Sequence, residues 1–227
     1  MPETEPLFTK LAGNYDRLNS ICSLGIDASW RKRLAAEIGQ CQRVLDVATG
    51  TAEVCIEVAR KWPDAKITGI DPSSHMIRIA EEKTRKLGLE GRIDLVEGSA
   101  ENLPFEDGLF DAVTIAFGIR NTVDPLLSLR EMARVLRPSG SIGVLEFAVP
   151  SNSLFSPIYM FYMRNVIPLL GSIFGCRPEY RYLAESIPSF PQRTEFAELM
   201  RDAGFEPPRW FELTLGIVVL YSGVKAS

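Results

Sequence analysis

Short apolar runs alternate with amphipathic stretches along the middle of the chain. The runs have the length of buried strands and fall at residues 43–48, 66–70, 92–97, 110–117 and 141–147. Apolar positions recur at helical spacing over residues 52–61, 73–87, 124–136 and, further along, 192–203. Strands that alternate with helices predict a parallel sheet with right-handed crossovers.

The two ends of the chain have different patterns. Residues 9–38 predict helices, one of them capped by Asp27 or Ser29. The last apolar runs, Arg209–Leu215 and Ile217–Ser222, predict an antiparallel hairpin on the sheet edge. Together the strands predict an α/β fold with a mostly parallel seven-stranded sheet, an antiparallel edge strand and helices on both faces.

The first strand–loop–helix unit carries candidate chemistry. Its strand ends near Asp46, a tight loop follows at Gly50, and Asp71 closes the next strand. Gly50 lets the backbone approach a ligand closely because it has no Cβ, and the helix after it offers free N–H groups. Asp71 stands where such folds hydrogen-bond ribose hydroxyls. The unit therefore predicts a site for an adenosine-containing cofactor, with Asp46 and Gly50 as part of it.

The same loop disfavours a pyrophosphate. It has one glycine where the dinucleotide fingerprint G-x-G-x-x-G has three, and Glu53 and Glu57 would repel a phosphate at the helix N-terminus. S-adenosylmethionine has ribose and adenine but no phosphate, and its cationic sulfonium tolerates acidic neighbours. The loop thus favours a methyltransferase over a dehydrogenase. A strand and turn without any ligand would leave Asp46 and Asp71 without a role.

Composition narrows the functional classes. The chain has 227 residues, a formal net charge of −4 and a pI near 5.3, which argue against broad electrostatic binding to nucleic acid. The four cysteines are scattered without metal-ligand spacing and there is one histidine, so we expect no zinc site, reduced thiols and a cytoplasmic location. The N-terminus lacks the basic-then-apolar form of a signal peptide.

One apolar tract, Leu154–Phe174, has the length that a bilayer requires. It contains Arg164, Pro168 and Gly171, and we therefore reject a transmembrane helix. A cover over a substrate, or a transient contact with the inner face of the membrane, stays open for this tract.

Several segments together carry a family resemblance. Segments typical of methyltransferases of many kinds are Val44–Thr51, Glu101–Phe105, Phe110–Asn121 and Arg134–Pro138. Far more specific are Phe117-Gly118-Ile119-Arg120-Asn121 and Tyr180-Arg181-Tyr182-Leu183-Ala184-Glu185-Ser186-Ile187. From about Tyr15 to Gly223 the chain resembles the ubiquinone/menaquinone biosynthesis C-methyltransferase family, within the Rossmann-like class I enzymes. We expect one domain over residues 1–227, with a helical cover at 1–40 and a helical substrate-cover insertion at 150–190.

The chain departs from the pattern of that family at several positions. The family usually has Gly at Ala52, often Asp at Glu53, often Ser at Ala116, and often Pro-Gly-Gly where this chain has Pro138-Ser139-Gly140. We expect Ala52 to keep a negative φ and cofactor binding to be retained. Ala116 has no hydroxyl to offer, so we leave it out of the predicted cofactor site.

The resemblance implies cofactor contacts at Thr51, Asp71, Ser99 and Ala100. Asp71 can accept both ribose hydroxyls, whereas capping of the following helix is its alternative role. Ser99 and Ala100 follow the third strand, where a polar side chain and a free N–H can contact the adenine edge; a plain turn is the alternative. Thr51 lies beside Gly50, and simple helix capping is its alternative.

Arg120 and Asn121 are the predicted catalytic residues. They follow the fourth strand, so they should lie at the carboxyl edge of the sheet, where open α/β sheets bind ligands. Arg120 would orient a phenolic oxygen and stabilise a phenolate, and Asn121 would hold the same ring. A surface Arg and a capping Asn are the alternative. The general base stays open between water held by Arg120 and the acids Asp16, Glu146 and Glu185.

The resemblance implies C-methylation of a demethylated polyprenyl quinol, either demethylmenaquinol or the ubiquinol precursor, with S-adenosyl-L-methionine as the cofactor. A methyltransferase for another small acceptor and a non-catalytic cofactor-binding scaffold subunit are the alternatives, and a homodimer stays open. The aromatic residues expected to enclose the quinol are Tyr15, Trp30, Tyr159, Phe161, Tyr162, Tyr180 and Tyr182.

Overall fold

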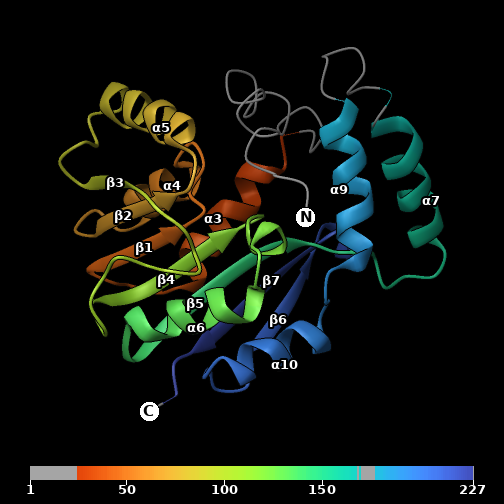
Figure 1. Ribbon diagram of the computed structural model, residues 1–227. Coiled ribbons are helices and arrows are strands. Elements are labelled where there is room, and N and C mark those ends of the chain that lie inside the picture. Colours follow the sequence, from red (N-terminus) through yellow and green to blue (C-terminus); the bar gives the residue numbers. More distant parts are fainter. Residues whose placement is uncertain (1–24, 168, 170–176, 227) are drawn as a thin grey trace.

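A seven-stranded sheet lies at the centre of the protein (Figure 1). The computed structural model describes residues 25–167, 169 and 177–226. The strand order is β3-β2-β1-β4-β5-β7-β6. The strands are β1 (Arg43–Val47), β2 (Lys66–Asp71), β3 (Ile93–Glu97), β4 (Phe110–Ala116), β5 (Leu136–Phe147), β6 (Arg209–Leu213) and β7 (Val218–Val224). Strands β1 to β5 are parallel, β7 is antiparallel to β5, and β6 is antiparallel to β7.

The predicted mostly parallel sheet of seven strands is confirmed, with one difference in placement. The antiparallel strand is β7, and it lies one place in from the edge, between β5 and β6. The outermost strand, β6, ends at Leu213, two residues earlier than predicted, because the chain turns in the short helix Thr214–Gly216.

Helices cover both faces of this sheet, as predicted (Figure 1). One apolar core lies between the sheet and α3 (Asp27–Glu37), α4 (Glu53–Lys61) and α5 (Ser74–Lys86). The other lies between the sheet and α6 (Pro125–Val135) and α10 (Thr194–Asp202). Because both faces are buried, β1 is apolar on both sides, and its residues 44–47 are all buried.

Helix caps follow the expected chemistry in two places and not in a third. Ser73 accepts a hydrogen bond from the Met76 amide at the start of α5, and Asp124 caps α6 ahead of Pro125. The cap expected of Asp27 or Ser29 was wrong, since Ile26 is the N-cap of α3 and makes no side-chain bond. Asp27 lies inside the first turn and pairs with Arg31.

Strand β5 begins five residues before the predicted start, at Leu136, directly after α6. The pairing of β4 with β5 shifts register between Phe110 and Ala112, because Pro138, Ser139 and Gly140 are extra residues of β5 in an irregular part of the pairing. Ser139 has a φ of 59°, the left-handed region that glycine adopts most easily. Residues 137–140, which no predicted element included, are therefore an irregular first part of the strand.

Within the predicted substrate cover, the described helices are α7 (Phe155–Phe161), a π-helical turn (Tyr162–Val166) and α9 (Arg177–Ser189). Tyr159, Met163 and Ile167 pack with Ala184 and Ile187 in a small apolar core of their own. The predicted cover at residues 1–40 falls largely outside the described residues, apart from α3, which contacts α4 and β5. A search of the described helices found none with the length and apolarity needed to cross a bilayer.

Candidate active site

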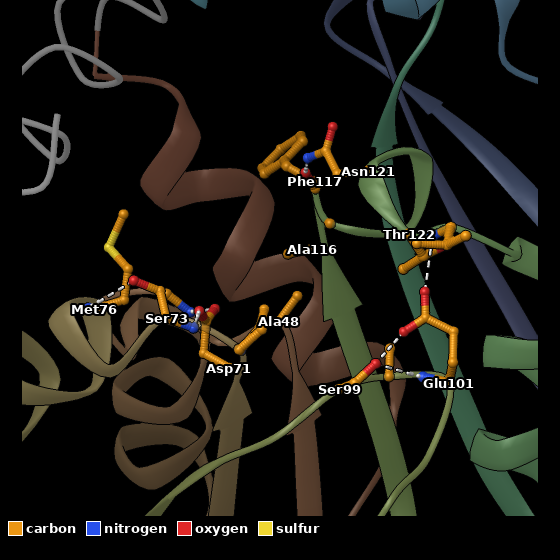
Figure 2. A pocket seen from close by; sticks show the side chains of 15 residues that line it. Ala48, Asp71, Ser73, Met76, Ser99, Glu101, Ala116, Phe117, Asn121 and Thr122 are labelled. Atoms are coloured by element: carbon orange, nitrogen blue, oxygen red, sulfur yellow. Dashed lines mark hydrogen bonds between the residues drawn. The ribbon is translucent and has the colours of Figure 1, made fainter. Parts of the chain in front are cut away.

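A pocket of about 340 Å³ opens at the carboxyl ends of β1 to β4. Strands β2 and β3 lie on one side of β1 and β4 on the other, so the chain reverses direction across the sheet here, which is where open α/β sheets bind ligands. Figure 2 shows the side chains around it. The lining residues are Ala48, Gly50, Asp71, Pro72, Ser73, Met76, Ser99, Ala100, Glu101, Ala116, Phe117, Gly118, Asn121, Thr122 and Val123.

The loop after β1 has an unusual backbone. Ala48, Gly50 and Ala52 have φ values of 51°, 55° and 64°. The expectation of a negative φ for Ala52 was therefore wrong, since this buried residue adopts the left-handed conformation that glycine takes without cost. A Cβ built on Gly50 would meet no atom within 4 Å, so this residue leaves the loop open toward the pocket. Backbone strain of this kind often accumulates at binding sites.

Asp46 is hydrogen-bonded within this loop on the side away from the pocket, and it is not one of the lining residues. Its carboxylate accepts hydrogen bonds of 2.7 Å from the hydroxyls of both Thr49 and Thr114. Burial raises the pKa of Asp46 to about 6, because these bonds only partly compensate for the loss of water. Thr51 is also buried and absent from the lining. Asp46 and Thr51, two of the six predicted cofactor residues, therefore lie behind the residues that line the pocket.

Asp71 lines the pocket and links two loops. One carboxylate oxygen accepts the Gly50 amide at 2.8 Å, and the other accepts the Ser73 amide at 2.9 Å. The helix cap is Ser73 rather than Asp71, so the structure does not assign Asp71 the alternative capping role. Burial raises the pKa of Asp71, and the two amide bonds oppose that rise. Figure 2 shows Asp71 beside Ser73 and Ala48.

Ser99 and Ala100 also line the pocket, together with a residue that the sequence reasoning missed. Glu101 is hydrogen-bonded to the Ser99 hydroxyl through one oxygen, and its other oxygen accepts the Val123 amide at 2.7 Å. Glu101 thus holds the loops after β3 and β4 together (Figure 2). The segment Glu101–Phe105 was part of the resemblance, but nothing in the sequence indicates that Glu101 faces the cavity. Met76 was missed in the same way.

Arg120 lies behind the pocket in a buried ion pair. Its Nη1 is 2.6 Å from the Glu146 carboxylate and also donates to the Phe117 carbonyl at 2.8 Å. The side chains of Arg120 and Glu146 are 6% and 2% exposed. Burial raises the pKa of Glu146, although Arg120 favours its charged form. Arg120 does reach the carboxyl edge of the sheet, yet it faces an acid there and is absent from the pocket lining.

Asn121 does line the pocket, and it connects the sheet edge to the cover. Its Nδ2 donates to the Phe117 carbonyl at 3.3 Å, and its Oδ1 accepts from the Tyr182 hydroxyl of α9 at 3.1 Å. The Phe117 backbone has a φ of 58°, so the turn that carries Arg120 and Asn121 is itself strained. Of the predicted catalytic pair, only Asn121 reaches the cavity.

The predicted aromatic enclosure is only partly formed. Trp30 packs against Phe117 and Phe147 beside the site, and Tyr159 is buried in the cover. Phe161 is 65% exposed and faces away from the small core of the cover, so it does not enclose a ligand there. Tyr15 and Asp16 lie outside the described residues.

The charges of the lining fit the expected cofactor. Asp71 and Glu101 are its two charged residues, and the described lining includes no Lys, Arg or His to pair with a phosphate. An adenosine group with a cationic sulfonium suits such a wall better than a pyrophosphate does. No group of three or more His, Cys, Asp or Glu side chains arranged for a metal was found among the described residues.

Comparison with known proteins identifies the family. The sequence profile of the ubiE/COQ5 methyltransferase family matches residues 3–225. The chain is 42% identical over 226 residues to the ubiquinone/menaquinone biosynthesis C-methyltransferase UbiE of Syntrophotalea carbinolica, covering 99% of this chain and 94% of the relative. It is 41% identical over 227 residues to the demethylmenaquinone methyltransferase of Porphyromonas gingivalis, covering 98% and 93%.

The solved structures show a similar fold at low identity. A SAM-dependent methyltransferase of Thermotoga maritima, described as a possible histamine N-methyltransferase, aligns with a TM-score of 0.68 and 21% identity over 98% of this chain and 100% of its own. That likeness concerns the fold alone. The matched profile and the near-complete alignments with relatives confirm the predicted family, and the chain belongs to the ubiE/COQ5 methyltransferase family.

Proposed function

We propose that this protein C-methylates a demethylated polyprenyl quinol, demethylmenaquinol or the ubiquinol precursor, with S-adenosylmethionine as the methyl donor. Relatives over 40% identical are named for that chemistry. The structural observation that carries the proposal is the hydrogen bond between Asn121 and Tyr182. It joins the two segments most specific to quinone-methylating enzymes, and it does so at the wall of the pocket.

The pocket divides into a cofactor side and an acceptor side. Asp71 and Gly50 would hold the ribose and the adjoining methionine portion, while Ser99, Ala100 and Glu101 would contact the adenine. Asn121 lies across the cavity from Asp71 in Figure 2, so it would meet the acceptor. Asp46 and Thr51 would act indirectly, by holding the loop that contains Gly50.

In this reaction the protein would contribute mainly by positioning the acceptor and by electrostatic stabilisation. The cofactor, when bound, supplies an electrophilic methyl group. A ring carbon becomes more electron-rich when the neighbouring phenol ionises, and a phenol has a pKa of about 10 in water. The Asn121 amide, held in place by the Tyr182 hydroxyl that donates to its Oδ1, would donate a hydrogen bond to the acceptor oxygen and so orient the ring. The charge of Arg120 is largely balanced by Glu146, so we assign Arg120 the task of positioning the turn that carries Asn121.

The acceptor is identified by the product. The purified chain is incubated with methyl-labelled S-adenosylmethionine and with each demethylated quinol, and the methylated carbon is located by mass spectrometry. Transfer to the ring carbon of either quinol supports the proposal. Transfer to a simple phenol but to neither quinol would assign another acceptor. Tight cofactor binding without any transfer would indicate a scaffold subunit.

We further propose that the protein works in the cytoplasm and contacts the inner face of the membrane peripherally. A polyprenyl acceptor resides in the bilayer, and the described thiols Cys41 and Cys55 are free. Cell fractionation with salt washes distinguishes a peripheral contact from a wholly aqueous location. The homodimer stays a prediction, which sedimentation of the pure protein measures.

A further inference from the structure

The helix that begins with α7 exposes a line of large apolar side chains. Leu154, Ile158, Phe161 and Leu169 are 83%, 66%, 65% and 65% exposed. Leu154, Ile158 and Phe161 are spaced by four and three residues, which puts them on one side of a helix. Leu169, beyond the π-helical turn Tyr162–Val166, is the next exposed large apolar residue along the chain. Soluble proteins rarely leave several large apolar side chains together in water unless they bind something. These four residues are called the outer face below.

The opposite side of the same helix is already occupied. Tyr159, Met163 and Ile167 are buried against Ala184 and Ile187. This stretch is therefore apolar on both sides, with one side packed on the protein and the other not covered by any of the residues that the structure describes. Figure 1 shows α7 at the periphery of the molecule, beyond α9 and away from the sheet. The outer face thus has no packing role within the described part of the chain.

The stretch of chain that contains the outer face has no acidic residue. Residues 147–178 include no Asp or Glu, although the whole chain has 29 acids and a net charge of −4. Arg164 is exposed in the middle of this stretch, whereas Arg181, on the neighbouring α9, pairs with the exposed Glu185 and adds no net charge. Asn165 is a polar residue among these apolar side chains. Its Nδ2 donates a hydrogen bond to the Phe161 carbonyl at 2.9 Å, which lowers the free-energy cost of removing the Asn165 amide from water.

We propose that the outer face is a docking surface for a bilayer that contains anionic phospholipids. Exposed apolar side chains with a cation beside them and no acid in the same stretch are the arrangement by which a helix lies in an anionic lipid interface. A second copy of the chain fits less well, because a symmetric contact would bring Arg164 of each copy against a stretch that has no acid from residue 147 to residue 178. The proposal names the surface for the membrane contact proposed above. It is measured without any quinol, so its failure is separate from failure of the proposed reaction.

Co-sedimentation of the full chain with vesicles tests the proposal. The vesicles contain equal parts of phosphatidylglycerol and phosphatidylcholine, or phosphatidylcholine alone. We expect the wild type to bind the anionic vesicles more tightly and to release with salt. Ile158→Glu and Phe161→Glu should weaken binding by about tenfold or more. Leu87→Glu is the matched control, because Leu87 is an exposed leucine outside this face and gains the same charge.

A second test uses a conservative substitution, so that its result does not depend on whether the charged variants fold. Phe161→Trp keeps an aromatic ring on the outer face, and lipids with brominated acyl chains should quench its fluorescence on binding, whereas Leu87→Trp should add no quenching. Equal vesicle binding by wild type and Phe161→Glu would overturn the proposal, as would no binding by the wild type. A lipid-free dimer that Phe161→Glu dissociates would assign the face to a subunit interface instead.

Discussion

Single residues account for much of the site's shape, and some occupy conformations that their type disfavours. Ala48, Ala52 and Phe117 all have positive φ values around the pocket. The resemblance indicated that related proteins usually have glycine at Ala52, and the φ of 64° gives the physical reason. A backbone angle of this kind has no signature in a single sequence. For that reason the sequence placed Ala52 correctly beside the loop but gave it the wrong conformation.

Ala52→Gly should leave the stability nearly unchanged. Relief of the left-handed conformation contributes roughly 1–2 kcal/mol, which offsets the lost buried methyl, about 1 kcal/mol, and the greater entropy of unfolded glycine, about 0.4–1 kcal/mol. Ala59→Gly is the matched control, because Ala59 is equally buried but lies within α4. It should cost about 2 kcal/mol. Denaturant unfolding measures both, and equal losses would contradict the argument.

The buried carboxyl of Asp46 makes stability depend on pH. Its pKa is raised to about 6 in the folded protein, from about 4 in an unfolded chain. Between these values the folded state binds the extra proton, so the free energy of unfolding should fall as pH rises from about 4 to about 6. Relative to Asp46→Asn, which does not titrate, wild type should lose about 2 kcal/mol across this window. A pH-independent difference between the two would refute the assignment.

At the scale of elements, the order of strands and helices was predictable, and the contacts between them were not. Apolar runs and helix periodicity predicted the central strands to within a few residues. The start of β5 was missed because Pro138 and Gly140 are residues that usually interrupt a strand. Arg120 was correctly expected at the sheet edge. Its partner Glu146 lies 26 residues away, and the partner of Asn121 lies 61 residues away. Such pairs are set by strand register and helix packing, which no single segment encodes.

Arg120→Met should destabilise the fold by about 3 kcal/mol or more, because it leaves Glu146 buried without its partner. The double variant Arg120→Met with Glu146→Leu should recover most of that loss, since an apolar pair of similar volume needs no compensation. Arg130→Met, on the exposed side of α6, is the control and should change little. Failure of the double variant to recover stability would point to a further role for this charge pair.

Asn121→Ala should reduce kcat while the affinity for S-adenosylhomocysteine stays within about twofold, since a contact made in the transition state acts on turnover. Tyr182→Phe, which removes the hydroxyl that bonds Asn121, should mainly raise the KM for the acceptor. Steady-state kinetics with calorimetric cofactor titration separate these effects. Wild-type turnover in Asn121→Ala would remove it from the acceptor site.

At the scale of the molecule, both the fold and the family were accessible from the sequence. The alternation of elements predicted the sheet, and the segments around Gly50 and Asn121 indicated the family. The site was only partly accessible. Gly50, Asp71, Ser99, Ala100 and Asn121 line the pocket, but a motif does not reveal which of its side chains point inward, and Asp46, Thr51 and Arg120 lie behind the wall.

Ligands should stabilise the whole protein selectively. A ligand that binds only the folded state at 100 times its Kd adds about 2.7 kcal/mol, which corresponds to a rise in Tm of roughly 5–10 °C at this chain length. We expect that rise with S-adenosylhomocysteine and none with NAD, because the described pocket lining has no cation for a pyrophosphate. Asp71→Ala should reduce the rise, whereas Asp94→Ala, an exposed carboxylate on β3, should not. A larger shift with NAD would reverse the cofactor assignment.

The interior place of β7 affects how the protein is made. It is the last strand of this sheet in chain order, so it leaves the ribosome after the other six, yet it fills the gap between β5 and β6. Until residues 218–224 emerge, the nascent chain has a long apolar β5 with one open edge, and β6 has not yet met the strand that it pairs with in the described sheet. Open strand edges are templates for aggregation. Synthesis thus passes through a late stage at which β5 has an open edge, and we expect a chain that stops before residue 218 to aggregate rather than to form a weaker enzyme.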